Sequence, residues 1–482
     1  MKQPMSSEGA MDRFIAAYLD CSLTVWERWA GATVLVLTLV LQFTSSLPST
    51  MALGLLAALA MISWTTPITA FYFIACSQTL PFPEDAMLNP TQLGFVVWPV
   101  VAVVTSKRID VRRFSALVVL LPFLIWYAVV GGETRELFSL HGDFLKVGLY
   151  ALIACHYVNV ARGRYLKCLL GLAVGACTVI FAFWAYTAGL PVELATYGGQ
   201  NSRGGFARIG SARADAVMVW PPLLLGVFSI IGIAVVSLKM CPESRQTGVL
   251  RWYALAVYFL SIPPLMSTMS HGSYFGFLLM SIFAVMAVKQ SMRGRRLALR
   301  EKRQLVKFGL IPLALVIVVY SLNLFQSRDR VSGLLSYYGK IRKKTTIAAS
   351  RTEVWSYSLR TICRYPISGV GSARWKEEIP SGYRAGGRYD SHNVFLEYGR
   401  STGVMGMVLI AMFFFYPVWS LGKHRSRNLY LPFYMAYFSM FIFWMVLSYA
   451  FYKPFWALWI MMSMMSLEHR ALFMQSATRN RK

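Results

Sequence analysis

The sequence is poor in charged residues: they make up 14% of its 482 residues, whereas soluble domains usually carry about 25%. Acids are the scarcer kind, with 21 Asp and Glu against 48 Lys and Arg. Hydrophobic residues account for 56% of the chain, which excludes an ordinary soluble protein and predicts an integral membrane protein. The N-terminal segment lacks the order of a cleaved signal, so we expect the first apolar run to stay as a span.

Paired cysteines and familiar catalytic motifs are also missing. The seven cysteines form no CxxC pair, and most lie in or beside apolar runs, which favours neither disulfides nor a zinc site. The sequence contains no GxxxxGK[ST] loop, no GxSxG elbow and no HExxH motif. No cluster of acids outside the predicted spans resembles a divalent-metal site. We therefore expect no metal and no cofactor.

Long apolar runs are what the sequence has in quantity. A helix that crosses a membrane needs about 20 mostly apolar residues, and the runs predict about 12–14 such helices. The predicted fold class is thus an all-α polytopic integral membrane protein. The predicted spans are residues 30–47, 50–65, 67–80, 91–106, 114–131, 144–161, 165–188, 214–238, 252–268, 272–289, 308–324, 401–421, 429–450 and 454–468.

The segment 50–80 is ambiguous, because SWTTP is either a turn between two spans or a kink inside one long helix. If it is divided and the N-terminus is cytoplasmic, the short basic loops fall on one side, as the positive-inside rule requires. We therefore predict the division, with both termini in the cytoplasm. The net charge of +27 then reflects cytoplasmic loops and surfaces that face anionic lipid or phosphate, rather than nucleic acid.

This topology divides the chain into four parts. They are an N-terminal transmembrane bundle (1–190), central spans (191–324) with a basic outer loop at 189–213, a large outer loop (325–400), and C-terminal spans with a basic tail (401–482). Between Gln326 and His392 the large loop holds thirteen Lys and Arg against five acids. Within it, residues 350–366 are predicted to form an amphipathic helix that ends at Pro366 and is followed by glycine-rich turns. The predicted packing face of this helix consists of Val354, Trp355, Ser358, Leu359 and Ile362.

His392 and Asn393 stand at the end of the large loop, directly before an apolar run. We predict a short helix that is capped by Asp390 or Ser391 and carries His392, Asn393, Leu396 and Glu397. With an ordinary pKa of about 6.5, a histidine is largely neutral at neutral pH and can take a proton. The alternative is an interfacial histidine that is bonded only to backbone.

The basic outer loop contains Arg203, Arg208 and Arg213 among glycines. Arginine offers planar, bidentate donors that match phosphate oxygens, so this loop would suit a lipid-linked phosphate. The alternative is a set of arginines that anchor the chain among lipid headgroups. A second polar candidate is His271 in the turn STMSHGSYFG, for which a satisfied loop histidine is the commoner outcome.

The segments RTEVWSYSLRTICRYPISGVG and SHNVFLEYGRSTGVMGMVLI resemble the bacterial O-antigen ligase and O-antigen polymerase family. The shared pattern is R-x3-W, then P-[LI]-x-G-x-G, then H-N-x2-L-E, and finally G-x2-G. In this sequence it falls on Arg351, Trp355, Pro366, Ile367, Gly369, Gly371, His392, Asn393, Leu396, Glu397, Gly403 and Gly406. The basic outer loop also resembles the family's R-x-x-G segment, with Arg208 or Arg213 as the matching arginine. One departure is Ser-His-Gly at 270–272, where members often carry Ser-Arg-Gly.

The resemblance implies a glycosyltransferase-C-like enzyme of the bacterial inner membrane whose large loop and active site face the periplasm. Family members transfer a glycan from a polyprenyl (undecaprenyl) diphosphate carrier. The acceptor is lipid A core in a ligase and another carrier-linked glycan in a polymerase, and we slightly prefer a polymerase. Because diphosphate is already a good leaving group, the reaction requires neither nucleotide nor metal. Further partners would be membrane lipid and polysaccharide assembly proteins.

The resemblance also implies roles for individual residues. His392 would act as the base or orient the acceptor, Arg208 and Arg213 would grip the diphosphate, and Asn393 or Glu397 would fix the imidazole. The remaining substrate-binding candidates are Arg203, His271 and Arg351. A rival from another class is a transporter of an anionic lipid or sugar. It would need paired charges inside its spans, and the predicted spans are nearly free of acids and bases.

Overall fold

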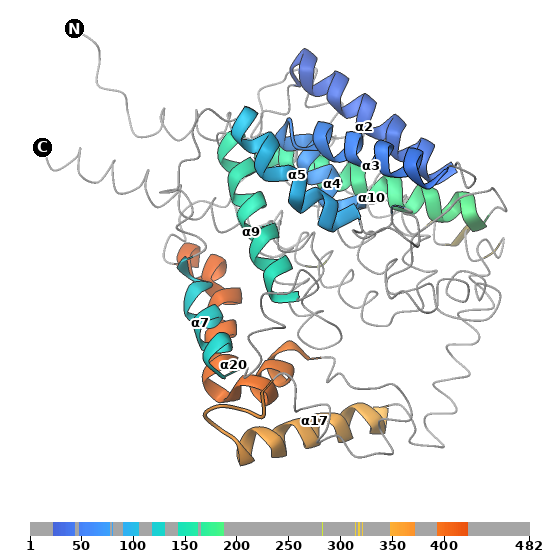
Figure 1. Ribbon diagram of the computed structural model, residues 1–482. Coiled ribbons are helices and arrows are strands. Elements are labelled where there is room, and N and C mark those ends of the chain that lie inside the picture. The colour runs from blue at the N-terminus through green and yellow to red at the C-terminus, as the bar shows by residue number, and fades with distance from the viewer. Residues whose placement is uncertain are drawn as a thin grey trace, which may run out of the picture.

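The computed structural model describes residues 23–43, 48–77, 80, 90–105, 118–130, 143–161, 165–187, 348–371 and 393–422, with isolated positions at 282, 314, 317–318 and 321. Every regular element in the described segments is a helix, which confirms the all-α prediction for this part of the chain (Figure 1). The helices are α2 (Val25–Phe43), α3 (Ser49–Ser63), α4 (Pro67–Cys76), α5 (Pro90–Thr105), α7 (Leu121–Val130), α9 (Asp143–Val160), α10 (Tyr165–Thr187), α17 (Ala348–Arg364) and α20 (Val394–Gly422).

Several predicted spans lie outside the described residues. They are 214–238, 252–268, 272–289, 429–450 and 454–468, each entirely or almost entirely, together with most of 308–324. Among the described residues, the segment Val394–Tyr416 is long and apolar enough to cross a membrane by length and composition, and the other apolar helices are shorter.

The segment 50–80 is divided, as predicted. Helix α3 ends at Ser63, and α4 begins at Pro67 after a short turn. Thr66 has extended backbone angles, and its side-chain oxygen accepts a hydrogen bond from the backbone N–H of Thr69, 3.3 Å away. Proline at the first position of a helix costs no hydrogen bond, because its missing N–H would have had no partner in the helix. The SWTTP segment is therefore a helix end followed directly by a new helix start.

Helices α4 and α10 pack unusually closely, because α10 presents two glycines four residues apart. A Cβ atom on Gly171 would collide with the carbonyl oxygen of Ile68, and one on Gly175 would lie 2.7 Å from that of Tyr72. Small residues at this spacing let two helix backbones approach each other, as is common in membrane proteins. The contacts rise together along both helices, so α4 and α10 run in the same direction.

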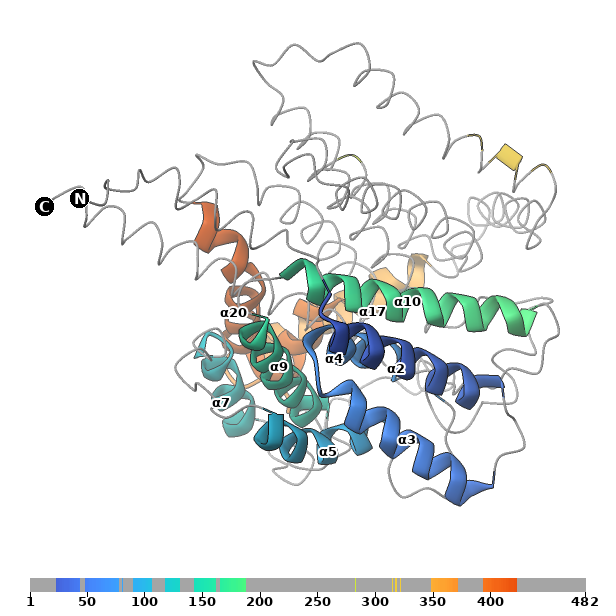
Figure 2. The ribbon, with the colours of Figure 1, turned by 90° about the horizontal axis from the view of Figure 1, so that it is seen from above.

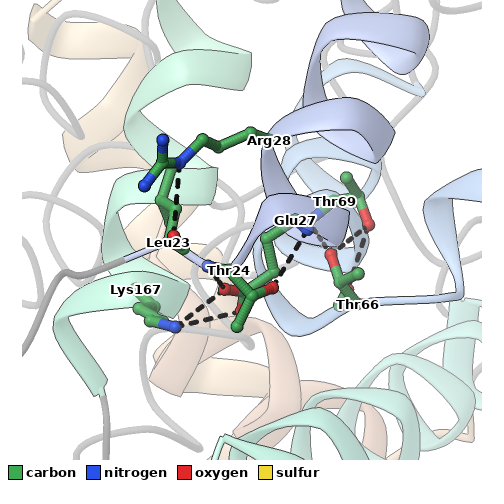
Figure 3. A network of polar contacts seen from close by, with 7 residues as sticks. All are labelled: Leu23, Thr24, Glu27, Arg28, Thr66, Thr69 and Lys167. Atoms are coloured by element: carbon green, nitrogen blue, oxygen red, sulfur yellow. Dashed lines mark hydrogen bonds and ion pairs between the residues drawn. The ribbon is translucent and has the colours of Figure 1, made fainter.

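Helix α2 is tied to α10 by a buried ion pair at one end and an aromatic contact at the other. Lys167 Nζ lies 2.9 and 3.1 Å from the two carboxylate oxygens of Glu27 (Figure 3). Thr24 and Glu27 also exchange side-chain-to-backbone hydrogen bonds of 2.7 and 3.1 Å, a capping box at the start of α2. At the far end the rings of Phe43 and Phe181 are 6.3 Å apart. Helix α2 therefore also runs parallel to α10.

The electrostatics of Glu27 follow from these contacts. Burial alone would raise the pKa of its carboxyl group, but the hydrogen bonds from Lys167 and Thr24 outweigh burial and hold the pKa below its ordinary value. The residue lies ahead of the predicted span 30–47, in the first turn of α2.

The three helices α2, α4 and α10 thus share one direction, and Figure 2 shows α2 and α10 lying alongside each other. Since α2 and α4 are parallel, the chain must reverse twice between Phe43 and Pro67, and α3 is the returning helix. This is the arrangement that two separate passes within 50–80 require. Trp64, at the second reversal, donates from Nε1 to the carbonyl oxygen of Gly94 at 3.0 Å and stacks on Tyr157 with ring centres 5.7 Å apart.

Candidate active site at the broken helix α20

Helix α20 begins with a side-chain cap at the family motif. The side-chain oxygen of Asn393 accepts hydrogen bonds from the backbone N–H groups of Phe395 and Leu396, at 3.0 and 3.2 Å. Asparagine in this position satisfies donors that the first turn of a helix leaves unpaired. The prediction that Asp390 or Ser391 caps this helix is therefore wrong, because Asn393 itself is the cap and stands before the first helical residue.

A break then divides α20. Gly403 has φ 75° and ψ −175°, which is far from helical and in the region that favours glycine. We call residues 394–402 the first half-helix and residues 404–422 the second half-helix. The predicted span 401–421 corresponds to the second half-helix and the end of the first, and the short helix predicted to carry Leu396 and Glu397 forms the rest of the first half-helix.

The break is held by a backbone junction with the turn that follows α17. The N–H of Val370 donates to the carbonyl oxygen of Arg400 at 2.9 Å, and that of Gly371 donates to Ser401 at 3.0 Å. In return, the N–H of Val404 donates to the carbonyl oxygen of Pro366 at 2.7 Å. We call the turn 366–371 together with residues 400–404 the junction. The predicted glycine-rich turn after Pro366 is confirmed here.

Glycine is required on both sides of the junction. Gly369 has φ 65°, and a Cβ atom there would lie 2.5 Å from the backbone of Ser401 and Thr402. A Cβ on Gly403 would collide with the carbonyl oxygen of Ile367. The P-[LI]-x-G-x-G and G-x2-G parts of the family pattern therefore meet backbone to backbone. These two parts of the pattern form the two sides of the junction.

A buried ion pair lies in the first half-helix. Arg400 is 1% exposed, and its Nη2 atom lies 2.9 Å from Oε1 of Glu397. Glu397 was predicted to fix the imidazole of His392; the partner the structure records for it is Arg400, and the predicted role stays a prediction. Arg400 was not singled out from the sequence, although an arginine in the polar run EYGRST before an apolar segment was a usable signal.

Helix α17 packs on α20 through its C-terminal half. Ile362, 6% exposed, lies over Gly399, where a Cβ atom would come within 2.7 Å of its Cδ1 atom. The predicted apolar face is correct for Ile362 but wrong for Leu359, which is 52% exposed. Thr361 is buried instead, because the junction after Tyr365 holds this turn of α17 against α20.

Helix α7 supports the break from the other side and lies beside α20 in Figure 1. The indole Nε1 of Trp126 donates to the carbonyl oxygen of Thr402 at 2.9 Å. The ring of Tyr398 meets those of Phe123 and Tyr127 at centroid distances of 5.0 and 6.3 Å. Trp126 escaped the sequence analysis because nothing in its surroundings distinguishes it from other aromatic residues of an apolar run.

The other predicted site residues lie beyond what the structure describes: Arg203, Arg208, Arg213, His271 and His392, and the side chain of Arg351, whose backbone belongs to α17. Among the described residues, no three His, Cys, Asp or Glu side chains gather as metal ligands would. Of the predicted residues, the structure thus brings together Asn393 and Glu397: the backbone N–H of Glu397 donates to the carbonyl oxygen of Asn393 at 2.9 Å.

Comparison with known proteins bears on this region. Residues 256–411 match the family model described as O-antigen ligase. The match includes α17, the junction and the His-Asn motif, whereas the basic outer loop and α7 precede it. A search among curated proteins gave no match. The family match supports a membrane-associated protein and glycan transfer of the ligase or polymerase type in surface-polysaccharide synthesis. The match to residues 256–411 confirms the resemblance to the O-antigen ligase and polymerase family that the motifs indicated.

Proposed function

We propose that this chain transfers a glycan from a polyprenyl diphosphate carrier to an acceptor hydroxyl at the periplasmic face of the bacterial inner membrane. The observation that carries the proposal is the capped start of α20. The junction fixes the first half-helix, Asn393 caps it, and His392 is the next residue toward the N-terminus. A polymerase of surface polysaccharide is preferred to a ligase.

The reaction assigns a task to each group. The bond between the anomeric carbon and the carrier diphosphate breaks, and the diphosphate keeps the electron pair. A bond forms between that carbon and the acceptor oxygen, whose proton passes to His392, a contribution typically of about 10²–10⁴-fold. Arg208 and Arg213 stabilise the charge that develops on the diphosphate, commonly the larger effect. The reaction needs no metal, because cationic side chains provide this stabilisation.

Arg203, His271 and Arg351 complete the proposed substrate contacts. Arg351 is four residues N-terminal to Trp355 of the family pattern and lies in the first turn of α17, which packs against the first half-helix. The partners are the lipid-linked glycan donor, a glycan or lipid A core acceptor, and membrane lipid.

Asn393 has a structural task within this mechanism. Its side-chain oxygen is engaged by two backbone N–H groups, so it orients the chain at His392 instead of accepting the substrate's proton. Substitution by Asp or Ser, which also cap helices, should preserve transfer, whereas Asn393→Ala should weaken it. Equal losses in Asn393→Ala and Asn393→Ser would instead assign the amide a direct role in catalysis.

The decisive test is His392→Ala, expressed in a strain that lacks the native gene and read out as surface polysaccharide on a gel. We expect loss of the transferred glycan at unchanged protein level. His424→Ala is the matched control: His424 lies in the short basic loop between the predicted spans 401–421 and 429–450, on the predicted cytoplasmic side, and should give the wild-type pattern. Wild-type chain lengths and attachment from a stably expressed His392→Ala variant would contradict the proposal.

The same gel separates the two acceptors. Loss of a polymerase leaves single repeat units attached to lipid A core, whereas loss of a ligase leaves the core bare while carrier-linked glycan accumulates. A transporter would move carrier-linked glycan across a vesicle membrane without forming a new glycosidic bond. Replacing Arg208 and Arg213 by Lys keeps the charge and removes the bidentate geometry, so undiminished output from that variant would argue against the diphosphate grip.

A further inference from the structure

The first half-helix ends in an unusual C-terminal cap. A helix that stops leaves its last carbonyl oxygens without intrahelical donors. Here the break at Gly403 follows three consecutive carbonyl groups, each of which accepts a hydrogen bond from outside α20. Arg400 and Ser401 receive theirs from the backbone of the junction turn, and Thr402 receives its bond from the side chain of Trp126.

The hydrogen bond between Trp126 and Thr402 is a specific tertiary contact. Trp126 and Thr402 are 276 positions apart in sequence, so only the tertiary fold brings them together. Gly406 also lies close to the indole: a Cβ atom there would collide with the Thr402 side chain and make an ordinary contact, at 3.4 Å, with Cδ1 of Trp126. The second glycine of the G-x2-G motif thus lies directly beside the ring.

We propose that Trp126 is a positioning residue for glycan transfer, although it lies outside the family-matched segment. By donating to Thr402, it completes the cap at the end of the first half-helix and fixes the direction in which that helix presents its start. The start is Asn393, preceded by His392. The inference rests on the proposed function, because the direction of the first half-helix matters for catalysis only if His392 takes part in the reaction.

A small rotation of the first half-helix about its C-terminal end displaces its N-terminal end. The first half-helix is about 13 Å long, so a rotation of about 5° at its C-terminal end moves its start by roughly 1 Å. A misplacement of that size at a catalytic group can cost about 100-fold in rate. The polar contact at Thr402 therefore affects the catalytic step more than it affects the binding of the carrier.

The alternative is that Trp126 matters only as a bulky ring that packs against α20. Trp126→Phe separates the two roles, because it keeps an aromatic ring and removes the N–H donor. Trp29→Phe is the matched control: Trp29 is 68% exposed on α2 and contributes to neither α7 nor α20. Phe123→Leu is the second comparison, since it reduces the packing on Tyr398 and leaves the indole donor intact.

The experiment uses the full-length protein. The initial rate of glycan transfer is measured in membrane vesicles that contain endogenous carrier-linked glycan. Binding of undecaprenyl diphosphate is measured on the purified protein, and hydrogen–deuterium exchange is followed over residues 394–402. For Trp126→Phe we expect a rate about tenfold lower, binding within about twofold of wild type, and faster exchange of the first half-helix. Trp29→Phe should match wild type in all three.

Each outcome decides the matter. A rate and an exchange pattern for Trp126→Phe that equal those of Trp29→Phe overturn the inference. If Trp126→Phe and Phe123→Leu are destabilised equally and lose rate equally, the role is packing and the inference also fails; a further rate loss of about fivefold in Trp126→Phe alone supports it. A fully active His392→Ala variant would refute the proposed function instead, while the exchange measurement would still test the cap.

Discussion

Two regions of the molecule are held together in different ways. One is the bundle of helices α2, α4 and α10, and the other is the junction, around which α7, α17 and α20 pack. In the bundle, side chains make the contacts: buried apolar faces, a pair of small residues and one ion pair between Glu27 and Lys167. At the junction, main-chain groups of 366–371 and 400–404 bond directly to each other, and one indole N–H completes the set.

This difference explains where the sequence carries a recognisable pattern. Many combinations of side chains can fill a helix interface if volume and polarity are kept, so most of the bundle leaves no signature apart from the glycine pair Gly171 and Gly175. At the junction, where backbone groups contact each other directly, the choice of residue types is restricted. Gly369 and Gly403 adopt positive φ and face each other's main chain, so glycine is required at fixed positions. The motif is visible because no other residue type fits.

The largest effect is expected from a methyl group at the junction. Gly403→Ala places a Cβ against the carbonyl oxygen of Ile367 at φ 75°, so it combines a backbone collision with a strained conformation. We expect a loss of more than about 4 kcal/mol at the junction and no detectable glycan transfer. Gly31→Ala is the control, because no atom lies within 4 Å of its Cβ position. Normal glycan transfer by Gly403→Ala would show that the junction tolerates side chains as the bundle does.

The next effect concerns the charged contact of the bundle. Lys167→Met leaves the Glu27 carboxylate buried without its cation, which should lower stability by about 3 kcal/mol. Thermal unfolding of the purified protein in detergent measures the change. The double variant Glu27→Gln with Lys167→Met should recover most of the loss, since no charge then remains buried. An unchanged melting temperature for Lys167→Met would mean that packing alone holds α2 against α10.

A methyl group in the bundle should cost less than one in the junction. Gly171→Ala brings a Cβ against the carbonyl oxygen of Ile68, but α10 is a regular helix there and can shift as a unit. We expect about 2 kcal/mol of destabilisation, from unfolding measurements in detergent. Gly54→Ala, with no atom within 4 Å of its Cβ position, should be neutral or slightly stabilising. If Gly171→Ala costs as much as Gly403→Ala, the contrast between the two regions is lost.

The smallest effect is the pH dependence of the ion pair. Because the folded-state pKa of Glu27 lies below its ordinary value, its carboxylate contributes stability at neutral pH that is lost as pH falls through the lowered folded pKa. The difference in melting temperature between wild type and Glu27→Gln should therefore be constant above about pH 5 and shrink below about pH 4.3. A difference that stays constant down to pH 3 would assign the contribution of Glu27 to packing.

Helices made of continuous apolar runs could be predicted closely from the sequence. The predicted spans 165–188 and 144–161 correspond to Tyr165–Thr187 and Asp143–Val160, because apolar residues dominate both helices. The division after residue 63 could also be predicted. There, threonine before proline favours a helix start, and the distribution of basic loops supplied an independent reason.

The site was harder to predict. A short helix around Leu396 and Glu397 was predicted, but its continuation through Arg400 to Thr402 was not, because the run EYGRST lowers the hydropathy there and the segment is held by tertiary contacts rather than by an apolar face. The family pattern located the glycines without revealing that they meet each other. The bond from Trp126 to Thr402 has no local signal, because it depends on how distant segments pack.

The long separation between Trp126 and Thr402 has a consequence for biosynthesis. At about 5–20 residues per second, the ribosome needs roughly 15–55 s to synthesise the 276 positions between them. During that time α7 is complete and its indole has no partner from α20, so the junction is assembled late, long after the first helices exist. Chains that stop before residue 404 contain the whole α2, α4 and α10 bundle but cannot form the junction. A truncated or stalled chain therefore lacks the junction, the region of the proposed active site, while the bundle is already complete.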